Sequence, residues 1–329
     1  MKTKPGLGEF GRIERFFRPL AAEFAGALSL LDDAAVIAVP SGAELVVTTD
    51  AVVEGVHFRS DDAPADVARK ALRVNLSDLA AKGASPLVYF LALSLGRAVP
   101  DNWVEAFAAG LAGDQSRYGI ALAGGDSVST AGPVTVSITA MGLLPAGRMV
   151  RRSGGVAGDR VFVTGTIGDA ALGLALLNSE IDAPDDVRTA LAARYRLPEP
   201  RCALASALLS HAHAAIDVSD GLAADFGHLC RASGVAGEIC AARVPLSPAA
   251  RHVLAAHPER LPAILCGGDD YEVLMAVPPE SAAELAAAAR AQGIQFTEIG
   301  HLEPGDGIAR IIGGDGRPMR LERPGWTHD

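Results

Sequence analysis

Aspartate side chains recur in this chain where apolar runs end, often beside a glycine or a hydroxyl residue. The segments are LLDDAAV with Asp33, LVVTTDAVV with Asp50, NLSDLAA with Asp78, ALAGGDS with Asp126, and AIDVSDGL with Asp217 and Asp220. Aspartate is a poor strand former, and hard oxygen ligands on rigid elements suit Mg²⁺, which also bridges substrate phosphates. The pattern therefore predicts a metal–phosphate site. For any single aspartate, a helix cap or a turn is the alternative interpretation.

The segment AIDVSDGL is the most specific of these signals. If residues 214–218 form a strand, Asp217 and Ser219 lie on one face, because side chains alternate along a strand. Asp220 then falls at the N-cap of the next helix, where exposed backbone N–H groups make a natural phosphate site. An ordinary capped helix is the competing interpretation.

Four further features could serve the same chemistry. Gly125 precedes Asp126 and would let the backbone approach a phosphate closely. In GRMVRRSG, one of Arg148, Arg151 or Arg152 could hold transferring oxygens with a fork of donors, unless the loop is simply a solvated basic loop. His57 follows the Asp50 segment in EGVHF. Trp326 could stack on a ligand or cover the edge of the core.

The elements that must position these residues follow from apolar periodicity and from turn residues. One helix is expected from Pro64 to Gly83, where the glycine can end it and Pro86 follows. Asn75 and Asp78 share a face of that helix. The other expected helices are 102–117, 170–178, 199–212, 221–232 and 281–292, and the expected strands are 44–50, 119–123, 134–143, 160–165 and 214–218.

The chain of 329 residues is long enough for about two domains. The composition of the chain changes at residues 145–159, PAGRMVRRSGGVAGD, a stretch rich in glycine and arginine. We therefore expect one domain over 1–147 and a second over 148–329. Because both mix strands with helices, the expected fold class is α+β, a mixed α/β protein.

Composition excludes several classes of protein. No apolar run approaches the roughly 20 residues of a membrane span, and no signal-peptide pattern follows the first lysines, so we expect a cytoplasmic protein. The net charge of −10, with only four lysines, disfavours a nucleic-acid binder and would require metal ions near any bound phosphate. Four cysteines without CxxC spacing are expected to be reduced thiols.

The familiar nucleotide-binding motifs are absent from the sequence. Neither Lys70 nor Lys82 lies in a P-loop, and TGTIGDAALG lacks the glycine spacing of a Rossmann site. Protein-kinase signatures are also missing. ATP would therefore have to be held by carboxylate-bound metals, glycine-rich backbone and arginine.

Taken together, these residues resemble the thiamine-monophosphate kinase family of the aminoimidazole ribonucleotide synthetase-like superfamily. The matching segments span the chain in order: GEFGRIERFF, DDAAV, TTDAVVEGVHF, NLSDLAAKGASP, GGDS, GRMVRRSGGVAGD, VTGTIGDAALGL, LPEPR, the Asp217–Leu222 segment, GGDDYEVL and GWTH. The resemblance implies ATP-dependent phosphorylation of thiamine monophosphate to the diphosphate with several Mg²⁺ ions. It also implies a homodimer whose N-terminal sheet domains form a barrel, and a C-terminal α/β sandwich.

The resemblance also implies roles for particular residues of this sequence. The implied metal ligands are Asp33, Thr48, Thr49, Asp50, Asp78, Asp126, Asp217 and Asp220. Gly125, Asp126, Arg152 and Ser219 match residues that contact ATP, and His57, Asp269 and Trp326 match residues that contact the substrate. Within these sets, the catalytic contribution is assigned to Asp50, Asp126, Arg152 and Asp220.

Three positions depart from the family pattern. Ser29-Leu30-Leu31 stands before the aspartate pair, where the family usually has glycines. Asp269 replaces the usual glutamate and has a shorter reach. The chain ends in Thr327-His328-Asp329, where an aromatic residue commonly follows the histidine.

The implied reaction suits this set of residues. Its acceptor is a phosphate monoester whose oxygen is already anionic, so no general base is needed, and positioning with metal bridging carries the transfer. We therefore assign no nucleophilic residue and expect direct in-line transfer. The alternatives are a sister enzyme that activates another oxygen with ATP, or a regulatory module that binds metal and nucleotide. Selenophosphate synthesis is disfavoured because no cysteine precedes Cys202, and the intact aspartates argue against a decayed enzyme.

Overall fold

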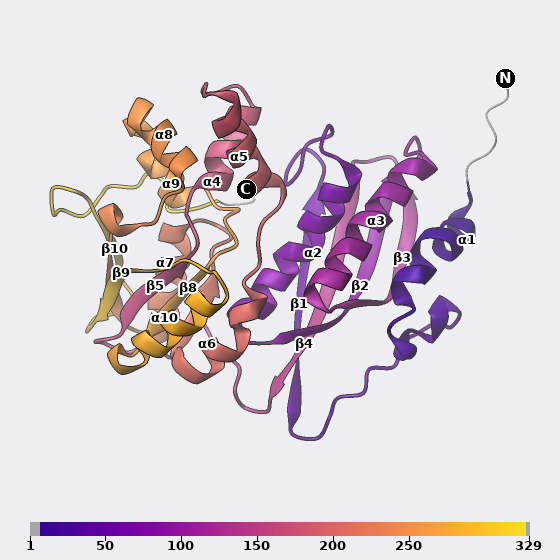
Figure 1. The fold of residues 1–329 in the computed structure, drawn as a ribbon, viewed down its shortest axis with the longest axis horizontal. Helices are drawn as coiled ribbons and strands as arrows, with labels where there is room; N and C mark the ends of the chain where they lie inside the picture. The colour runs from indigo at the N-terminus through magenta and orange to yellow at the C-terminus, as the bar shows by residue number, and fades with distance from the viewer. Residues whose placement is uncertain (1–6, 327–329) are drawn as a thin grey trace. The chain divides into compact units, whose positions relative to one another are not determined.

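The computed structural model describes residues 7–326, and the chain forms two compact units. The N-terminal unit comprises residues 1–79 and 85–147, and the C-terminal unit comprises residues 80–84 and 148–329. The short segment 80–84 thus belongs to the C-terminal unit, although the residues on either side of it belong to the other. Each unit contains a sheet with helices packed against it (Figure 1).

The N-terminal unit is built on a four-stranded sheet with the order β1-β4-β2-β3. Its strands are β1 (Ala43–Val53), β2 (Ser85–Gly96), β3 (Ala121–Thr130) and β4 (Thr135–Pro145). Strand β4 is antiparallel to β1 and to β2, whereas β2 and β3 run parallel. The edges of the sheet are therefore β1 and β3.

Two long helices, α2 (Pro64–Ala81) and α3 (Asp101–Tyr118), lie over one face of this sheet (Figure 1). Alternate residues of β4, namely Val136, Ile138 and Ala140, are fully buried, whereas those between them are only half-buried. This alternation marks one core face and one less covered face. Helix α2 ends as predicted, because Gly83 follows it with a φ of 76°, a left-handed conformation that suits glycine.

The start of the chain adds short helical turns beside β3 (Figure 1). They are α1 (Glu9–Arg12), η1 (Ile13–Phe17), η2 (Arg18–Ala21) and η3 (Ala25–Leu30). Arg12 anchors this segment through an ion pair of 2.8 Å with Asp101, in the first turn of α3.

The C-terminal unit is built on a six-stranded sheet with the order β10-β7-β9-β5-β8-β6. Its strands are β5 (Arg160–Thr164), β6 (Ala214–Asp217), β7 (Ala236–Cys240), β8 (Val273–Val277), β9 (Phe296–Glu303) and β10 (Ala309–Ile312). Val161 and Val163 of β5 belong to one apolar cluster, and Phe162 belongs to another. Because side chains alternate across a strand, both faces of this sheet are buried.

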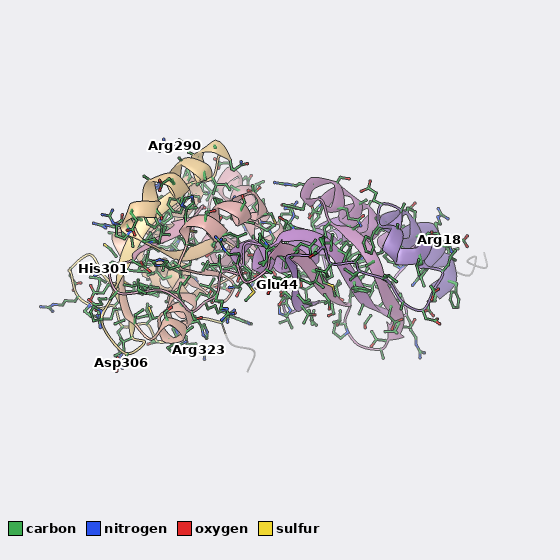
Figure 2. All side chains as sticks on the ribbon, turned by 90° about the horizontal axis from the view of Figure 1, so that it is seen from below. Arg18, Glu44, Arg290, His301, Asp306 and Arg323 are labelled. Atoms are coloured by element: carbon green, nitrogen blue, oxygen red, sulfur yellow. The ribbon has the colours of Figure 1, made fainter. Side chains whose placement is uncertain are left out.

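Helices cover both faces of the second sheet and complete an α/β sandwich. The larger apolar cluster packs α4 (Asp169–Leu177), α5 (Asp185–Arg196), α7 (Leu222–Ser233), α8 (Pro248–Ala256) and α9 (Leu261–Cys266), and the smaller packs α6 (Ala205–His211) and α10 (Ala282–Ala291). Short turns are η4 (Cys202–Leu204), η5 (Ala241–Arg243), η6 (Pro258–Arg260) and η7 (Pro279–Ser281). Figure 2 shows exposed side chains such as Arg290, His301 and Asp306 projecting outward from this unit.

The predicted mixed α/β class is confirmed, but several elements differ in extent from the prediction. The strand expected at 119–123 runs instead from Ala121 to Thr130, through the GGDS segment. The helix expected at 199–212 does not begin until residues 202–205, because Pro198 and Pro200 disfavour helical backbone in the residue before each. Helix α5 was not predicted.

Two expectations drawn from composition can be compared with the structure. Within the described residues, Cys202, Cys230, Cys240 and Cys266 form no disulfide with one another. None of the helices between residues 7 and 326 combines the length and the apolar character that a membrane crossing requires. The final Thr327-His328-Asp329 segment, which departs from the family pattern, lies outside the described residues.

Candidate active site

Strand β1 and helix α2 join two of the predicted metal ligands in the N-terminal unit. The hydroxyl of Thr48, in β1, donates a hydrogen bond of 2.5 Å to Oδ2 of Asp78, in α2. The bond links the sheet to the helix that covers it. A hydrogen bond of this kind fixes the direction of a carboxylate, which helps a metal ligand to keep its geometry.

Asp50 lies inside β1 and not at the end of the strand, where it was predicted. Strand β1 continues to Val53, and Asp50 is paired with Ile138 of β4. The neighbouring Thr49 donates its hydroxyl hydrogen to the carbonyl oxygen of Ile138 over 3.2 Å. Asp126 likewise lies within β3, opposite Ala92. Both strands are edges of the sheet, where natural proteins often place charged side chains.

A cavity of about 440 Å³ brings together three predicted site residues of the N-terminal unit. Asp33, Gly125 and Asp126 all line it. Most of the remaining wall is apolar and comes from Phe10, Ile13, Phe17, Ala27, Leu30, Phe90, Leu91, Leu93, Leu122 and Ala123. Such a lining suits a ligand with an apolar body and a charged end.

Gly125 has a structural requirement of its own within the sheet. A Cβ atom added at this position would lie 2.0 Å from the carbonyl oxygen of Leu91 in the adjacent strand β2. Only glycine permits so close an approach. The residue type at 125 is therefore explained by strand packing, and its contact with a phosphate stays a prediction.

Three consecutive residues before the aspartate pair adopt left-handed backbone. The φ angles of Leu28, Ser29 and Leu30 are 49°, 58° and 54°. For residues other than glycine this conformation costs roughly 1–2 kcal/mol each. The family that this chain resembles usually has glycines around positions 29 and 30, and glycine adopts left-handed backbone without that cost. The Val36 N–H group closes the segment through a bond of 2.9 Å to the carbonyl of Gly26.

His57 lies just after β1 with a fixed ring orientation. Its Nδ1 atom accepts a hydrogen bond of 3.1 Å from the backbone N–H of Val53, so the neutral ring carries its proton on Nε2. Its carbonyl oxygen also accepts a bond of 2.9 Å from Nζ of Lys70 in α2. The ring is thus positioned by the main chain, and its role toward a substrate stays a prediction.

Three predicted site segments of the C-terminal unit, far apart in sequence, meet at the turn after β6. The Asp269 N–H donates to the carbonyl of Ser219 at 2.8 Å, and the Trp326 N–H donates to the carbonyl of Asp220 at 2.9 Å. Asp217 ends β6 just before this turn and is buried. Trp326 is 54% exposed, so it does not lie in the core of this unit.

Two local predictions about this turn differ from the structure by one residue. Strand β6 ends at Asp217, one residue before the predicted end at Val218. Helix α7 begins at Leu222 with Gly221 as its N-cap residue, so Asp220 does not cap it. Gly221 has φ 123° and ψ 145°, a region that essentially only glycine occupies. The helix therefore begins one residue later than a cap at Asp220 would place it.

The side chain that does cap this turn is Asp225, which sequence reasoning missed. Its Oδ2 atom accepts hydrogen bonds from the backbone N–H groups of Asp220, at 3.1 Å, and Gly221, at 3.2 Å. Burial, and next the charge of Asp220, raise the pKa of Asp225 to about 7, against those two bonds and the charge of Arg152. The available signal was an acidic residue in the first turn of α7, four residues after the glycine.

Arg152 belongs to the same electrostatic neighbourhood as Asp220. Desolvation and then the charges of Arg231 and Arg152 lower the pKa of His228, whereas Asp220 opposes that shift. The Arg152 side chain is exposed, and its carbonyl oxygen accepts a bond of 3.3 Å from the Ser233 hydroxyl. An exposed guanidinium beside carboxylates can bind an incoming phosphate.

Asp269 belongs to a strained loop held by buried carboxylates. Asp269 and Tyr271 have positive φ angles of 62° and 51°. Between them, both carboxylate oxygens of Asp270 accept from the Gly168 N–H, at 2.9 and 3.0 Å. Strained backbone of this kind persists where its surroundings fix it and is common at ligand sites.

The end of this loop is held by an ion network around Glu272. Its fully buried carboxylate accepts bonds from Arg201, from Arg194 at 2.9 Å, and from the Thr164 hydroxyl at 2.7 Å. Arg201 belongs to the LPEPR segment, so the structure gives that segment a role in fixing the loop that carries Asp269.

Within residues 7–326, no three histidine, cysteine, aspartate or glutamate side chains gather into a ready metal cluster. The predicted ligands belong to β1, α2, β3 and the segment before β1 in the N-terminal unit, and to β6 and the turn after it in the C-terminal unit. Two of them, Thr48 and Thr49, are hydroxyls. Carboxylate and hydroxyl oxygens are hard ligands of the kind that suits Mg²⁺, which also takes waters and substrate phosphates.

Family models match most of the chain. The AIR synthase related protein N-terminal domain matches residues 31–144, and the AIR synthase related protein C-terminal domain matches residues 156–313. The chain is 46% identical to thiamine-monophosphate kinase of Caulobacter vibrioides over 323 residues, which cover 97% of this chain and 90% of that protein.

Solved structures show the same similarity. Thiamine-monophosphate kinase from Stenotrophomonas maltophilia K279a matches with a TM-score of 0.84 and 36% identity, covering 94% of this chain and 97% of that one. AaThiL complexed with AMPPCP and TMP matches with a TM-score of 0.78 and 32% identity, covering 100% of both chains.

Proposed function

This chain belongs to the thiamine-monophosphate kinases of the AIR synthase related family, and we propose that it phosphorylates thiamine monophosphate with ATP. It is a phosphotransferase with a phosphate group as acceptor, and its products are thiamine diphosphate and ADP. The observation that carries this function is the match, over the whole of both chains, to a relative complexed with AMPPCP, an ATP analogue, and TMP.

The residues of this chain fit several Mg²⁺ ions as the resident cofactor. The proposed ligands are Asp33, Thr48, Thr49, Asp50, Asp78, Asp126, Asp217 and Asp220, all of which offer hard oxygen atoms. Two observations support them: Thr48 is bonded to Asp78, and Asp33 and Asp126 line one cavity. When bound, the ions would offset the negative charge of the phosphates, which a chain of net charge −10 cannot offset alone.

The remaining proposed roles are binding and positioning. Gly125 and Asp126 would hold ATP at the cavity of the N-terminal unit, while Arg152 and Ser219 would donate hydrogen bonds to its phosphates. His57, Asp269 and Trp326 would contact thiamine monophosphate. The acceptor oxygen is already anionic, so the transfer needs no base, and residues that orient both substrates lower the barrier.

The test of this function is a product assay with matched variants. Purified protein with MgATP and thiamine monophosphate should form thiamine diphosphate and ADP in equal amounts. Asp33→Asn and Asp126→Asn should each lower kcat by roughly 10²–10³, the usual loss when one electrostatic stabiliser is removed. Asp32→Asn is the control, because Asp32 lines the same cavity and is not a proposed ligand. ADP without thiamine diphosphate would point to a different acceptor and contradict the proposal.

We further propose a homodimer built through the N-terminal units, in the cytoplasm. The sheet of the N-terminal unit supports the dimer, because its two edge strands, β1 and β3, carry the proposed ligands Asp50 and Asp126. Asp50 is paired with Ile138, Ile138 with Leu91, and Leu91 with Gly125. Three strand spacings therefore separate Asp50 from Gly125, a distance of roughly 14 Å. Strand β3 of a second copy beside β1 would close the edges into a barrel and bring Asp126 of that copy near Asp50.

Mixing two inactive variants tests this arrangement. In a dimer of Asp50→Asn with Asp126→Asn, one shared site would keep both native aspartates, so mixing should restore activity. Differently tagged copies report whether mixed dimers have formed. If mixed dimers form and stay inactive, both aspartates serve a site within one chain. Light scattering that gives a monomer at micromolar concentration would contradict the dimer itself.

A further inference from the structure

The turn that carries Ser219 and Asp220 is shaped by a glycine with no room for a side chain. A Cβ atom at Gly221 would lie 2.7 Å from the backbone carbon and oxygen of Cys266. Gly268, two residues after Cys266, is equally close: a Cβ atom there would lie 2.5 Å from the Ser219 carbonyl oxygen. The backbone of this turn is therefore in close contact with the loop before β8.

Both polar groups of the Asp220 backbone are occupied. The carbonyl oxygen accepts from the Trp326 N–H at 2.9 Å, and the N–H donates to Oδ2 of Asp225 at 3.1 Å. The first partner belongs to the last described residue of the chain, whereas the second is a side chain on a long helix. Asp225 therefore anchors the turn to α7.

Asp225 is well suited to hold the turn without touching a substrate. Its side chain is only 2% exposed, and one of its oxygens holds two successive backbone N–H groups, of Asp220 and Gly221. The arrangement resembles a capping box, in which a side chain in the first helical turn reaches back to the N-cap N–H. Any movement of the Asp225 carboxylate would rotate the peptide from which the Asp220 side chain extends.

We propose that Asp225 is a positioning residue, which holds the Ser219–Gly221 backbone so that the Asp220 carboxylate and the Ser219 hydroxyl are directed at the metal-bound phosphates. This inference rests on the proposed function, because it takes Asp220 as a metal ligand. Groups that orient a metal ligand typically contribute 10–100-fold to metal affinity or activity. Asp225 would do so through the backbone.

The experiment compares four variants of the full-length protein. Asp225→Ala removes the acceptor, and Asp225→Asn keeps an oxygen that can accept both N–H groups. Asp220→Asn removes the proposed ligand itself. Asp159→Ala is the control, because Asp159 is equally buried and also accepts a backbone N–H, from Val156 at 2.9 Å, away from this turn. Two properties are measured: Mn²⁺ binding without substrates, by electron paramagnetic resonance, and steady-state kinetics.

Asp225→Ala should weaken Mn²⁺ binding and lower kcat by roughly 10–100-fold, with little change in the KM for thiamine monophosphate. Asp225→Asn should keep most of the Mn²⁺ affinity and most of kcat. Asp159→Ala should change neither the Mn²⁺ affinity nor kcat. If Asp225→Ala does not fold, Asp225→Glu replaces it, because the longer side chain displaces the turn while keeping its acceptor. A loss in Asp220→Asn without a loss in the Asp225 variants overturns this inference. No loss in Asp220→Asn instead overturns the proposed role of Asp220.

Discussion

Two buried carboxylates of the C-terminal unit bind backbone N–H groups of loops that border proposed site residues. Asp225 accepts a hydrogen bond from the N–H group of Asp220. Asp270, which follows Asp269 in the sequence, accepts one from the N–H group of Gly168. Burial disfavours the charged form of each carboxyl group and raises its pKa. The same groups that shape the site should therefore make the stability of the unit depend on pH.

The clearest case is Asp270. Burial, with the nearby charges of Asp169 and Glu272, raises the pKa of Asp270 well above its usual value of 3.8, although the Gly168 N–H and Arg194 oppose the shift. The folded state thus binds the proton more tightly than the unfolded state. The stability from this group is complete below the unfolded pKa and is lost as the pH rises toward the raised one.

We expect Asp270→Asn to reduce the loss of stability between pH 4 and pH 8. The asparagine can still accept from the Gly168 N–H, but it carries no charge to desolvate. Urea unfolding of both proteins across this range gives the free energy of unfolding. Parallel pH profiles for wild type and variant would show that Asp270 does not titrate in this way.

Trp326 gives a second prediction at this scale. Its exposed indole offers an aromatic face, and the thiazolium ring of the substrate is a permanent cation, a contact worth about 0.5–2 kcal/mol. Trp326→Ala should raise the KM for thiamine monophosphate several-fold and leave that for ATP nearly unchanged. Trp103, which stacks on Phe107 at 5.3 Å between ring centroids, provides the control: Trp103→Ala should lower the melting temperature without this selective effect. Equal weakening of both substrates by Trp326→Ala would make Trp326 structural.

At the scale of elements, the turn η3 before the aspartate pair carries strain. Ser29 is exposed and has a φ of 58°, so its side chain gains little packing while its backbone is held in a costly region. We expect Ser29→Gly to raise the free energy of unfolding, by up to about 1 kcal/mol after the greater freedom of unfolded glycine is subtracted. Thermal and denaturant unfolding measure the change.

The control for this prediction is a serine in a regular helix. Ser116 is exposed in α3, where glycine is unfavourable by roughly 0.5–1 kcal/mol. Ser116→Gly should therefore shift stability in the opposite direction. A loss of stability in both variants would mean that the left-handed backbone at Ser29 is not a cost that glycine relieves.

Local sequence patterns predicted the long elements but not their exact ends. The end of α2 at Gly83 could be predicted, because the left-handed residue after a helix is usually glycine. The sequence did not predict that β1 continues past Asp50 or that β3 runs through Asp126. Pairing with β4 and β2 overrides the low strand propensity of aspartate. Asp225 was missed for a similar reason. Its partners are the backbone groups of a glycine turn, and no pattern of side chains records their direction.

At the scale of the molecule, charge should govern substrate binding. The chain carries a net charge of −10, and the proposed ligands are carboxylates, so a nucleotide without its metal ion would be repelled. Removing divalent cations with EDTA should therefore abolish ATP binding as well as turnover. Calorimetric titration of ATP, with EDTA or with excess Mg²⁺, gives the comparison. Equally tight binding in both conditions would contradict the metal sites.

The membership of residues 80–84 in the C-terminal unit bears on how such a chain can be recombined. Lys82 donates from Nζ to the carbonyl of Ala215 at 2.8 Å, and its own carbonyl accepts from the Val150 N–H at 3.2 Å. A Cβ atom at Gly83 would lie 2.5 Å from Leu209. A gene crossover after residue 147 would therefore graft a foreign second half onto a pentapeptide inherited from the other parent. Functional chimeras of two homologous genes should therefore need residues 80–84 and residues 148–329 from the same parent. The residues that must be inherited together are thus not continuous in the sequence.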